Sequence, residues 1–221
     1  LFSLGYLDLR SRAQSERIFQ SGCLHIGRIL EQLGESPETF EDLHRLLSDT
    51  YFGNFSVFQF SPDEWAVKQI FPIMPIHRLA EEPTRNGVVA DLTCDSDGKI
   101  DRFIGDAEDQ PTVRLHSLNG SPYFLAVFLI GAYQEILGDL HNLFGDTDAV
   151  HVRLDAEQGY SVEHLVEGDA VSEVLSYVQY DRRNLTERVR RLTERALRNG
   201  QISLEDSALL RRRYDQGLDG Y

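Results

Sequence analysis

A cysteine followed by two aspartates is the first group of residues in this sequence that could do chemistry. Cys94 comes after an apolar segment and precedes Asp95, Asp97 and Gly98. Negative charge on neighbouring carboxylates disfavours the thiolate, so this thiol is better suited to donate a proton than to act as a nucleophile. The two carboxylates could bind a cation, and a planar guanidinium fork favours such paired oxygen partners.

The same segment also has purely structural interpretations. Asp95-Ser96-Asp97-Gly98 is favourable turn chemistry. It also begins like the calcium loop of an EF-hand, although the twelfth position holds Asp106 in place of glutamate. From the spacing alone, a functional loop and a plain turn both remain open.

Tyr133 is the second candidate, because it follows Gly131 and Ala132 at the end of an apolar run. Glycine leaves room for a phosphate to approach backbone amides, and a tyrosine hydroxyl can donate a hydrogen bond to that phosphate. The alternative is an ordinary buried aromatic side chain.

A third group contains residue types that ligate zinc or manganese, namely Asp139, His141, Asp146, Asp148 and His151. These residues lack a clean i,i+4 pair, and apolar residues are interleaved as in a short packed helix. We therefore predict no dedicated metal site here. The remaining histidines show no partner pattern and are expected on the surface or in the core with satisfied hydrogen bonds; they are residues 25, 44, 77, 116 and 164.

The composition excludes several classes of function. A net charge of −14 argues against nucleic acid or an anionic membrane as partner. No segment approaches the roughly 18 apolar residues of a membrane span. Cys23 and Cys94 have no zinc spacing, and free thiols in a reducing cytoplasm are the simplest expectation. Leu1 to Gly5 contain no Met and no signal peptide, so the sequence resembles the middle of a longer protein.

Helices are predicted at the start of the sequence. Apolar spacing predicts a helix over residues 8–33, with Cys23 in its core and Gly34 as its C-terminal cap. Ser36-Pro37 is typical of a new helix start, with Phe40 on the apolar face of that helix. We expect these two helices to form a hairpin.

Strands are expected from Tyr51 onward. Residues 51–58 are aromatic and favour β structure, and a short helix is predicted around 63–69. The prolines of 71–76 confine that segment to an extended edge strand. A further strand is expected over 87–92, and the nearly continuous apolar run over 123–130 predicts a strand buried on both faces.

The last third of the sequence predicts a hairpin and then helices. Alternation over 150–164 with a turn at Gln158-Gly159 is typical of a β-hairpin. Apolar stripes over 171–178 and 185–196 predict helices, and Ser203 with Asp206 resembles a capping box that starts a final helix. The fold class is α+β, divided into a helical segment (1–50), a β-rich barrel-like or sandwich-like domain (51–168) and a helical bundle (169–221).

The segments around Cys94 and Tyr133 together resemble the biosynthetic arginine decarboxylases, which use pyridoxal phosphate (PLP) and belong with the ornithine and diaminopimelate decarboxylases. The motifs that carry the resemblance are residues 92–98 and 131–146, supported by 54–59 and 71–79. The similarity extends over essentially the whole chain, is most specific between residues 51 and 154, and is weaker over the last forty residues.

The resemblance implies a role for each candidate residue. The matching cysteine delivers a proton after CO₂ leaves, so Cys94 takes that role, and Asp95, with Asp97 as a second carboxylate, would bind the distal cationic group of the substrate. Tyr133 would contact the cofactor phosphate. The ornithine enzymes have a Phe-Asn pair at the position of His141 and Asn142. Because histidine replaces the phenylalanine here, the resemblance implies only that His141 lies near the cofactor pocket, and not that it has the same packing role.

The activity implied is conversion of L-arginine to agmatine and CO₂ for polyamine (spermidine) biosynthesis, in a homo-oligomer whose active sites form between subunits, with magnesium expected in such enzymes. The family holds PLP through a Schiff-base lysine in a barrel, and neither Lys68 nor Lys99 matches it. We therefore expect the C-terminal portion of such an enzyme, inactive alone. A non-catalytic regulatory partner and a stand-alone metal-dependent enzyme are the alternatives.

Overall fold

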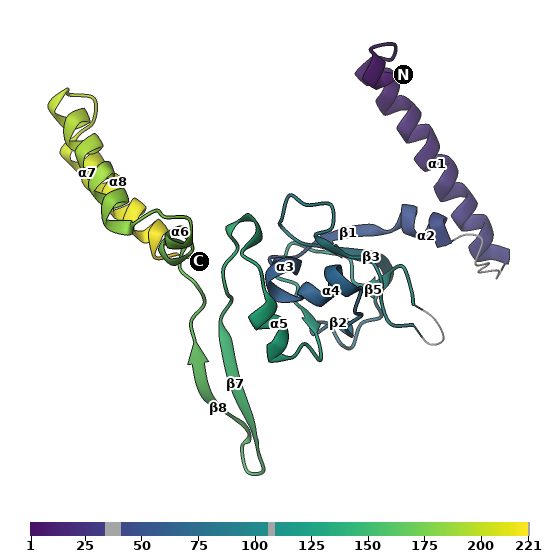
Figure 1. Ribbon diagram of the computed structural model, residues 1–221. Coiled ribbons are helices and arrows are strands. Elements are labelled where there is room, and N and C mark those ends of the chain that lie inside the picture. Colours follow the sequence, from purple (N-terminus) through teal and green to yellow (C-terminus); the bar gives the residue numbers. More distant parts are fainter. Residues whose placement is uncertain (34–40, 106–108, 221) are drawn as a thin grey trace. The chain divides into compact units, whose positions relative to one another are not determined.

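The computed structural model describes residues 1–33, 41–105 and 109–220 (Figure 1). The chain forms two compact units, each made of two segments. Unit 1 comprises Leu1–Asn54 and Asp63–Gly131, and unit 2 comprises Phe55–Pro62 and Ala132–Tyr221. None of the helices in the described ranges is both long and apolar enough to cross a membrane.

Unit 1 begins with a short 3₁₀ turn, η1 (Phe2–Leu4), and two α-helices, α1 (Leu9–Leu33) and α2 (Glu41–Leu47). Asp8 caps α1, because its Oδ1 accepts a hydrogen bond from the backbone N–H of Ser11 at 2.8 Å. Cys23 is 7% exposed, which confirms its predicted core position. The predicted cap at Gly34 and the predicted helix start at Ser36-Pro37, with Phe40, lie outside the described residues.

The main sheet of unit 1 is built around β3 (Arg85–Ala90). The strand β1 (Asp49–Phe52) pairs with β3 in parallel, whereas β4 (Lys99–Ile100) and β5 (Val113–Leu115) pair with it antiparallel. The core contains side chains from each strand, namely Tyr51, Val89, Ile100 and Leu115, and also Phe103 from the segment after β4. The expected strand over 87–92 is therefore confirmed, with its end at Ala90.

A second, two-stranded sheet pairs β2 (Ile73–Pro75) with β6 (Leu125–Val127) antiparallel. The predicted edge strand over 71–76 is confirmed, and so is the short helix near 63–69, which is α4 (Pro62–Val67). The predicted long buried strand over 123–130 is wrong. Only three of its residues form a strand, Leu129 takes a φ of +63° just after it, and that side chain is 84% exposed.

Unit 2 starts with α3 (Val57–Phe60), whose first turn is capped by Ser56 Oγ, which accepts a hydrogen bond from Gln59 N–H at 3.3 Å. The expectation that 51–58 favours β structure is confirmed only at its start, because β1 ends at Phe52 and the Ser56 cap begins a helical turn. The helix α5 (Ala132–Leu137) packs on α3, and a 3₁₀ turn, η3 (His141–Leu143), follows.

The strands β7 (Ala149–Asp155) and β8 (Gly159–Val166) form a long two-stranded ribbon (Figure 1). This confirms the predicted hairpin. Val150, Val152 and Leu154 of β7 lie opposite apolar residues of β8, and all three are more than half exposed. The ribbon therefore has one apolar face that is open in this chain.

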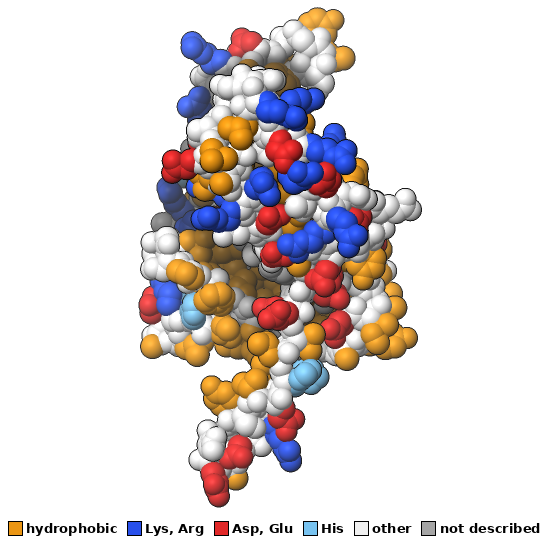
Figure 2. All heavy atoms as spheres, turned by 90° about the vertical axis from the view of Figure 1, so that its left-hand side faces the viewer, with side chains coloured by type: hydrophobic (Ala, Val, Ile, Leu, Met, Phe, Trp, Pro, Cys, Tyr) orange, Lys and Arg blue, Asp and Glu red, His pale blue; other side chains and the backbone are white. Residues whose placement is uncertain are grey.

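Three helices complete unit 2: α6 (Val171–Tyr177), α7 (Arg182–Arg198) and α8 (Leu204–Leu218). The predicted capping box is confirmed, with Asp206 N–H donating to Ser203 Oγ at 3.0 Å. Figure 2 shows basic and acidic side chains intermixed over these helices. Within this mixture, hydrogen bonds from Arg190 and Arg191 lower the pKa of Glu187 to about 2.

The α+β class is confirmed by this arrangement of helices and small sheets. Among the described residues the strands form one four-stranded and two two-stranded sheets, and none of these closes into the barrel that was one expected form of the central domain.

Candidate functional site

The Cys94 segment is the loop that joins β3 to β4, and a buried aspartate organises it. Asp91 is 2% exposed, and its Oδ1 accepts hydrogen bonds from the backbone N–H and the hydroxyl of Thr93, both at 2.8 Å. The backbone N–H of Asp91 donates to the carbonyl of Gly98 at 2.8 Å, which closes the loop at its base. A side chain buried under the loop thus fixes the segment that carries the candidate residues.

Gly98 occupies the base of the loop because no larger residue fits. A Cβ at this position would lie 2.2 Å from Asp91 Oδ1 and 2.4 Å from Thr93 Oγ1. These separations are far below van der Waals contact, so the loop conformation requires glycine for close approach.

Cys94, Asp95 and Asp97 are all exposed on this loop. Asp95 Oδ1 accepts a hydrogen bond from the backbone N–H of Asp97 at 3.0 Å, which is an Asx-type turn. The loop therefore has the hydrogen bonding of a turn and also carries a thiol and two carboxylates that are exposed to solvent. Asp106, the twelfth position of the calcium-loop comparison, lies outside the described residues.

Tyr133 lies at the start of α5 in unit 2, and its side chain is 71% exposed. This position excludes the alternative of an ordinary buried aromatic residue within this chain. Gly138 ends the helix against α3, where a Cβ would lie 2.6 Å from the carbonyl oxygen of Gln59. Asp139 N–H donates to the Phe58 carbonyl at 3.0 Å, so α3 anchors the segment that follows Tyr133.

Three residues of the possible metal cluster, His141, Asp146 and Asp148, have separate structural contacts. The His141 ring packs against Phe58 with centroids 4.4 Å apart and planes tilted by 45°, and Asp146 accepts a hydrogen bond from the Gln59 amide. Asp148 Oδ1 accepts from Gly168 N–H at 2.8 Å. Within the described ranges, no three His, Cys, Asp or Glu side chains are arranged to hold a metal ion.

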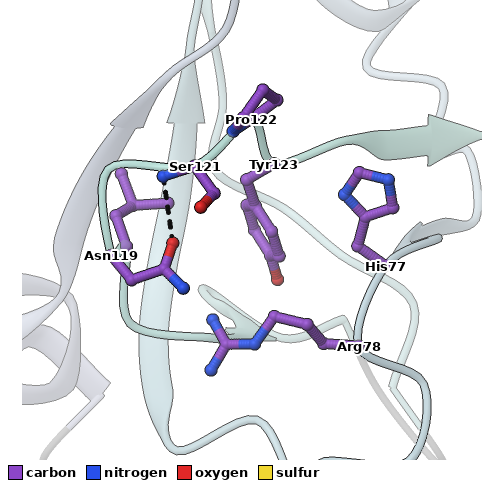
Figure 3. A pocket seen from close by; sticks show the side chains of 7 residues that line it. His77, Arg78, Asn119, Ser121, Pro122 and Tyr123 are labelled. Atoms are coloured by element: carbon purple, nitrogen blue, oxygen red, sulfur yellow. Dashed lines mark hydrogen bonds between the residues drawn. The ribbon is translucent and has the colours of Figure 1, made fainter.

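A pocket of about 210 Å³ in unit 1 was not predicted from the sequence (Figure 3). Figure 3 shows the ring of Tyr123 between His77 and the Asn119–Ser121 turn, with the Arg78 guanidinium beneath. Arg78 donates to Glu81 Oε2 at 2.6 and 2.9 Å and to the Ser117 carbonyl at 2.8 Å. Its charge is therefore compensated within the protein.

His116 contacts Tyr123, which lines this pocket, and is 3% exposed. Its Nδ1 is 2.8 Å from the Tyr123 hydroxyl, and its Nε2 is 3.0 Å from the Glu81 carbonyl. The expectation that His116 is either a surface residue or a satisfied core residue is resolved in favour of the core.

Glu64 is a buried acid that sequence reasoning missed. It lies on α4, is 5% exposed, and its Oε2 has no hydrogen-bond partner among the described residues. Desolvation raises the pKa of Glu64 to about 7, against the opposing charges of Lys68 and Arg102. Its position after Pro62 indicated a helix start, but burial depends on packing that no local pattern shows.

The described residues do not form a complete PLP site. Tyr133 supplies an exposed hydroxyl, but unit 2, which contains it, has no lysine in its sequence. In unit 1 the Lys99 ammonium is paired with Asp101 at 2.6 Å, and neither Lys68 nor Lys99 lines the pocket in Figure 3. No step that needs the cofactor can be assigned to this chain's lysines.

Models of two protein families match segments of this chain. Residues 1–44 match the arginine decarboxylase helical bundle domain, and residues 171–221 match the arginine decarboxylase C-terminal helical extension. The biosynthetic arginine decarboxylases of Gloeobacter violaceus and a Nostoc species are 51% and 52% identical over all of this chain, which covers 35% and 32% of their lengths.

A solved structure shows the same relation in three dimensions. The crystal structure of the biosynthetic arginine decarboxylase from Campylobacter jejuni matches 99% of this chain with a TM-score of 0.75 and 33% identity, over 33% of its own length. The chain spans about a third of the length of these relatives. By sequence and by fold, the chain is similar over essentially its full length to a portion of the biosynthetic arginine decarboxylases.

Proposed function

We propose that this chain is the C-terminal portion of a PLP-dependent enzyme that converts L-arginine to agmatine and CO₂ in polyamine biosynthesis. The observation that carries the proposal is the match over the full chain at about half identity to enzymes of that name. It is supported by a rigid loop that exposes a thiol and two carboxylates. The division into segments 1–50, 51–168 and 169–221 is part of the same proposal.

Cys94 acts as the proton donor in this proposal. When the bond between the α-carbon and the carboxylate breaks, CO₂ leaves and its electron pair remains on the α-carbon. The Sγ–H of Cys94 transfers its proton to that carbon, and the thiolate then regains a proton from water. PLP, held by a lysine outside this sequence, supplies the electron sink for the decarboxylation.

Asp95 and Asp97 bind the distal guanidinium of the substrate. A guanidinium presents N–H donors in a fixed fork, and two exposed carboxylates on one short loop can accept from both sides of it. Tyr133 contributes its exposed hydroxyl to the cofactor phosphate. The rest of the active site comes from the remainder of the protein, including a neighbouring subunit, so a homo-oligomer is part of the proposal.

The proposal also includes the cellular compartment of the protein and its requirement for a metal ion. Neither Cys23 nor Cys94 forms a disulfide in this structure, in keeping with a reducing cytoplasm. A requirement for magnesium is proposed from the family resemblance, and we assign no residue of this chain to it.

The test is CO₂ release by the complete protein that contains this sequence, with carboxyl-labelled arginine, ornithine and lysine as competing substrates. We expect arginine to be preferred, and Asp95→Asn to lower kcat/KM for arginine by about tenfold or more, since it removes one charge-assisted contact. Asp109→Asn is the matched control, because Asp109 is an exposed carboxylate of the same unit that pairs with Arg102.

Two outcomes would contradict the proposal. Preference for ornithine or lysine would contradict the substrate, and absence of any decarboxylation would contradict the activity. In the second case the chain would fit a non-catalytic regulatory partner of a decarboxylase.

A further inference from the structure

The β7–β8 ribbon places two histidines face to face. His151 and His164 are directly opposite in the strand register, next to the irregularity between His151 and Val152. Directly opposed residues of an antiparallel pair have Cβ atoms about 5 Å apart and project on the same face. Their ring centroids are 5.7 Å apart, with the planes at 85°.

This separation is close to what a shared metal ion requires. With a metal–nitrogen bond of about 2.0–2.1 Å, each ring centroid lies about 3.2 Å from the ion, and tetrahedral geometry then places the centroids about 5.2 Å apart. The observed 5.7 Å exceeds that value by half an ångström. Small side-chain rotations close such a gap on an exposed strand face.

The surroundings leave both imidazoles available. Both side chains are exposed, and within the described parts of the chain neither makes a hydrogen bond or ion pair. Arg153, two residues after His151 on β7, is paired with Glu163 at 3.0 Å. The net charge of −14 favours the approach of cations in general.

We infer that His151 and His164 form a two-imidazole site for a borderline divalent metal ion of the zinc and copper class. Imidazole nitrogen suits these ions, whereas magnesium and calcium take oxygen ligands. Water completes the coordination, because no third His, Cys, Asp or Glu is arranged around the pair in the described ranges. The inference does not depend on the proposed decarboxylation.

The test is a zinc titration of the metal-free complete protein against a chromogenic chelator. His164→Gln and His151→Asn each leave one imidazole, so each should weaken zinc binding by about tenfold or more relative to the unsubstituted protein. The double variant should lose little beyond either single variant, because chelation is already lost. His25→Asn is the matched control, since His25 is an exposed histidine on α1, outside the ribbon.

Additional readouts separate chelation from a change in folding. Copper(II) bound to the unsubstituted protein should show coupling to two nitrogen nuclei by electron paramagnetic resonance, and each single variant should show one. Melting temperatures in chelator should agree among all variants.

Three results would overturn the inference. They are equal zinc affinity for the unsubstituted protein and His164→Gln, an equal loss in His25→Asn, and displacement of zinc by an equal concentration of magnesium.

Discussion

Substituting Gly98 with alanine should open the Cys94 loop from its base. The added Cβ would lie 2.2 Å from Asp91 Oδ1, so these atoms must separate by about 1 Å to reach ordinary contact. Such overpacking costs about 1–3 kcal/mol. Weakening the two hydrogen bonds from Thr93 to Asp91 adds about 1 kcal/mol each. We therefore expect a loss of about 3–5 kcal/mol in the free energy of unfolding, measured in urea.

The same substitution should reduce activity more than stability alone explains. A displacement of about 1 Å in catalytic groups can cost about a hundredfold in rate. The assay is arginine decarboxylation by the complete protein at a temperature where the variant is folded. We expect kcat to fall with the displaced Cys94, and KM to rise with the displaced Asp95 and Asp97.

Gly22→Ala is the matched control for Gly98→Ala. Gly22 lies inside α1, and a Cβ there meets no atom within 4 Å. Alanine in a helix interior should stabilise the protein by about 0.5–1 kcal/mol. If the two variants had the same stability and activity, the argument that Gly98 is fixed by its contact with Asp91 would be refuted.

Three further predictions concern other parts of the chain. Glu64 has its pKa raised from 4.5 to about 7, so the folded state holds more protons between these values and stability falls as pH rises through them. Glu64→Gln should remove this fall and gain about 3 kcal/mol above pH 7 in urea unfolding; parallel pH profiles would contradict it. Ser203→Ala should cost about 1 kcal/mol through the lost cap on α8, by thermal unfolding, and no change would show that the box contributes nothing. The isolated 221-residue chain should self-associate in sedimentation, because Leu154 and Tyr160 on the ribbon are 88% and 62% exposed; a monomer that binds PLP would contradict this.

The helices and the hairpin could be predicted from the sequence because their signals are local. The apolar spacing of α1, the Ser203–Asp206 box and the alternation of β7 and β8 each depend on residues that are close in the chain. Two predictions were wrong, namely the β structure expected at the end of 51–58 and the long strand expected over 123–130. The apolar run after Tyr123 forms only a short strand, because the chain turns at Leu129 with a positive φ.

The candidate residues could be predicted from the sequence, but the buried residue that holds their loop in place could not. The types and spacing of Cys94, Asp95 and Asp97 indicated a thiol and carboxylates on one loop, and the structure places them so. Asp91 carried no comparable signal, because its role depends on burial beneath Gly98. Glu64 and the His151–His164 pair likewise arise from packing and strand register.

The most direct test of the central claim is the Cys94→Ala variant of the complete protein, with agmatine and CO₂ measured together. If Cys94 delivers the proton, agmatine formation should fall by about a hundredfold or more, and the ratio of agmatine to CO₂ should drop below one. Cys23→Ala, at a buried cysteine on α1, should leave that ratio unchanged. An unchanged agmatine rate in Cys94→Ala would contradict the account.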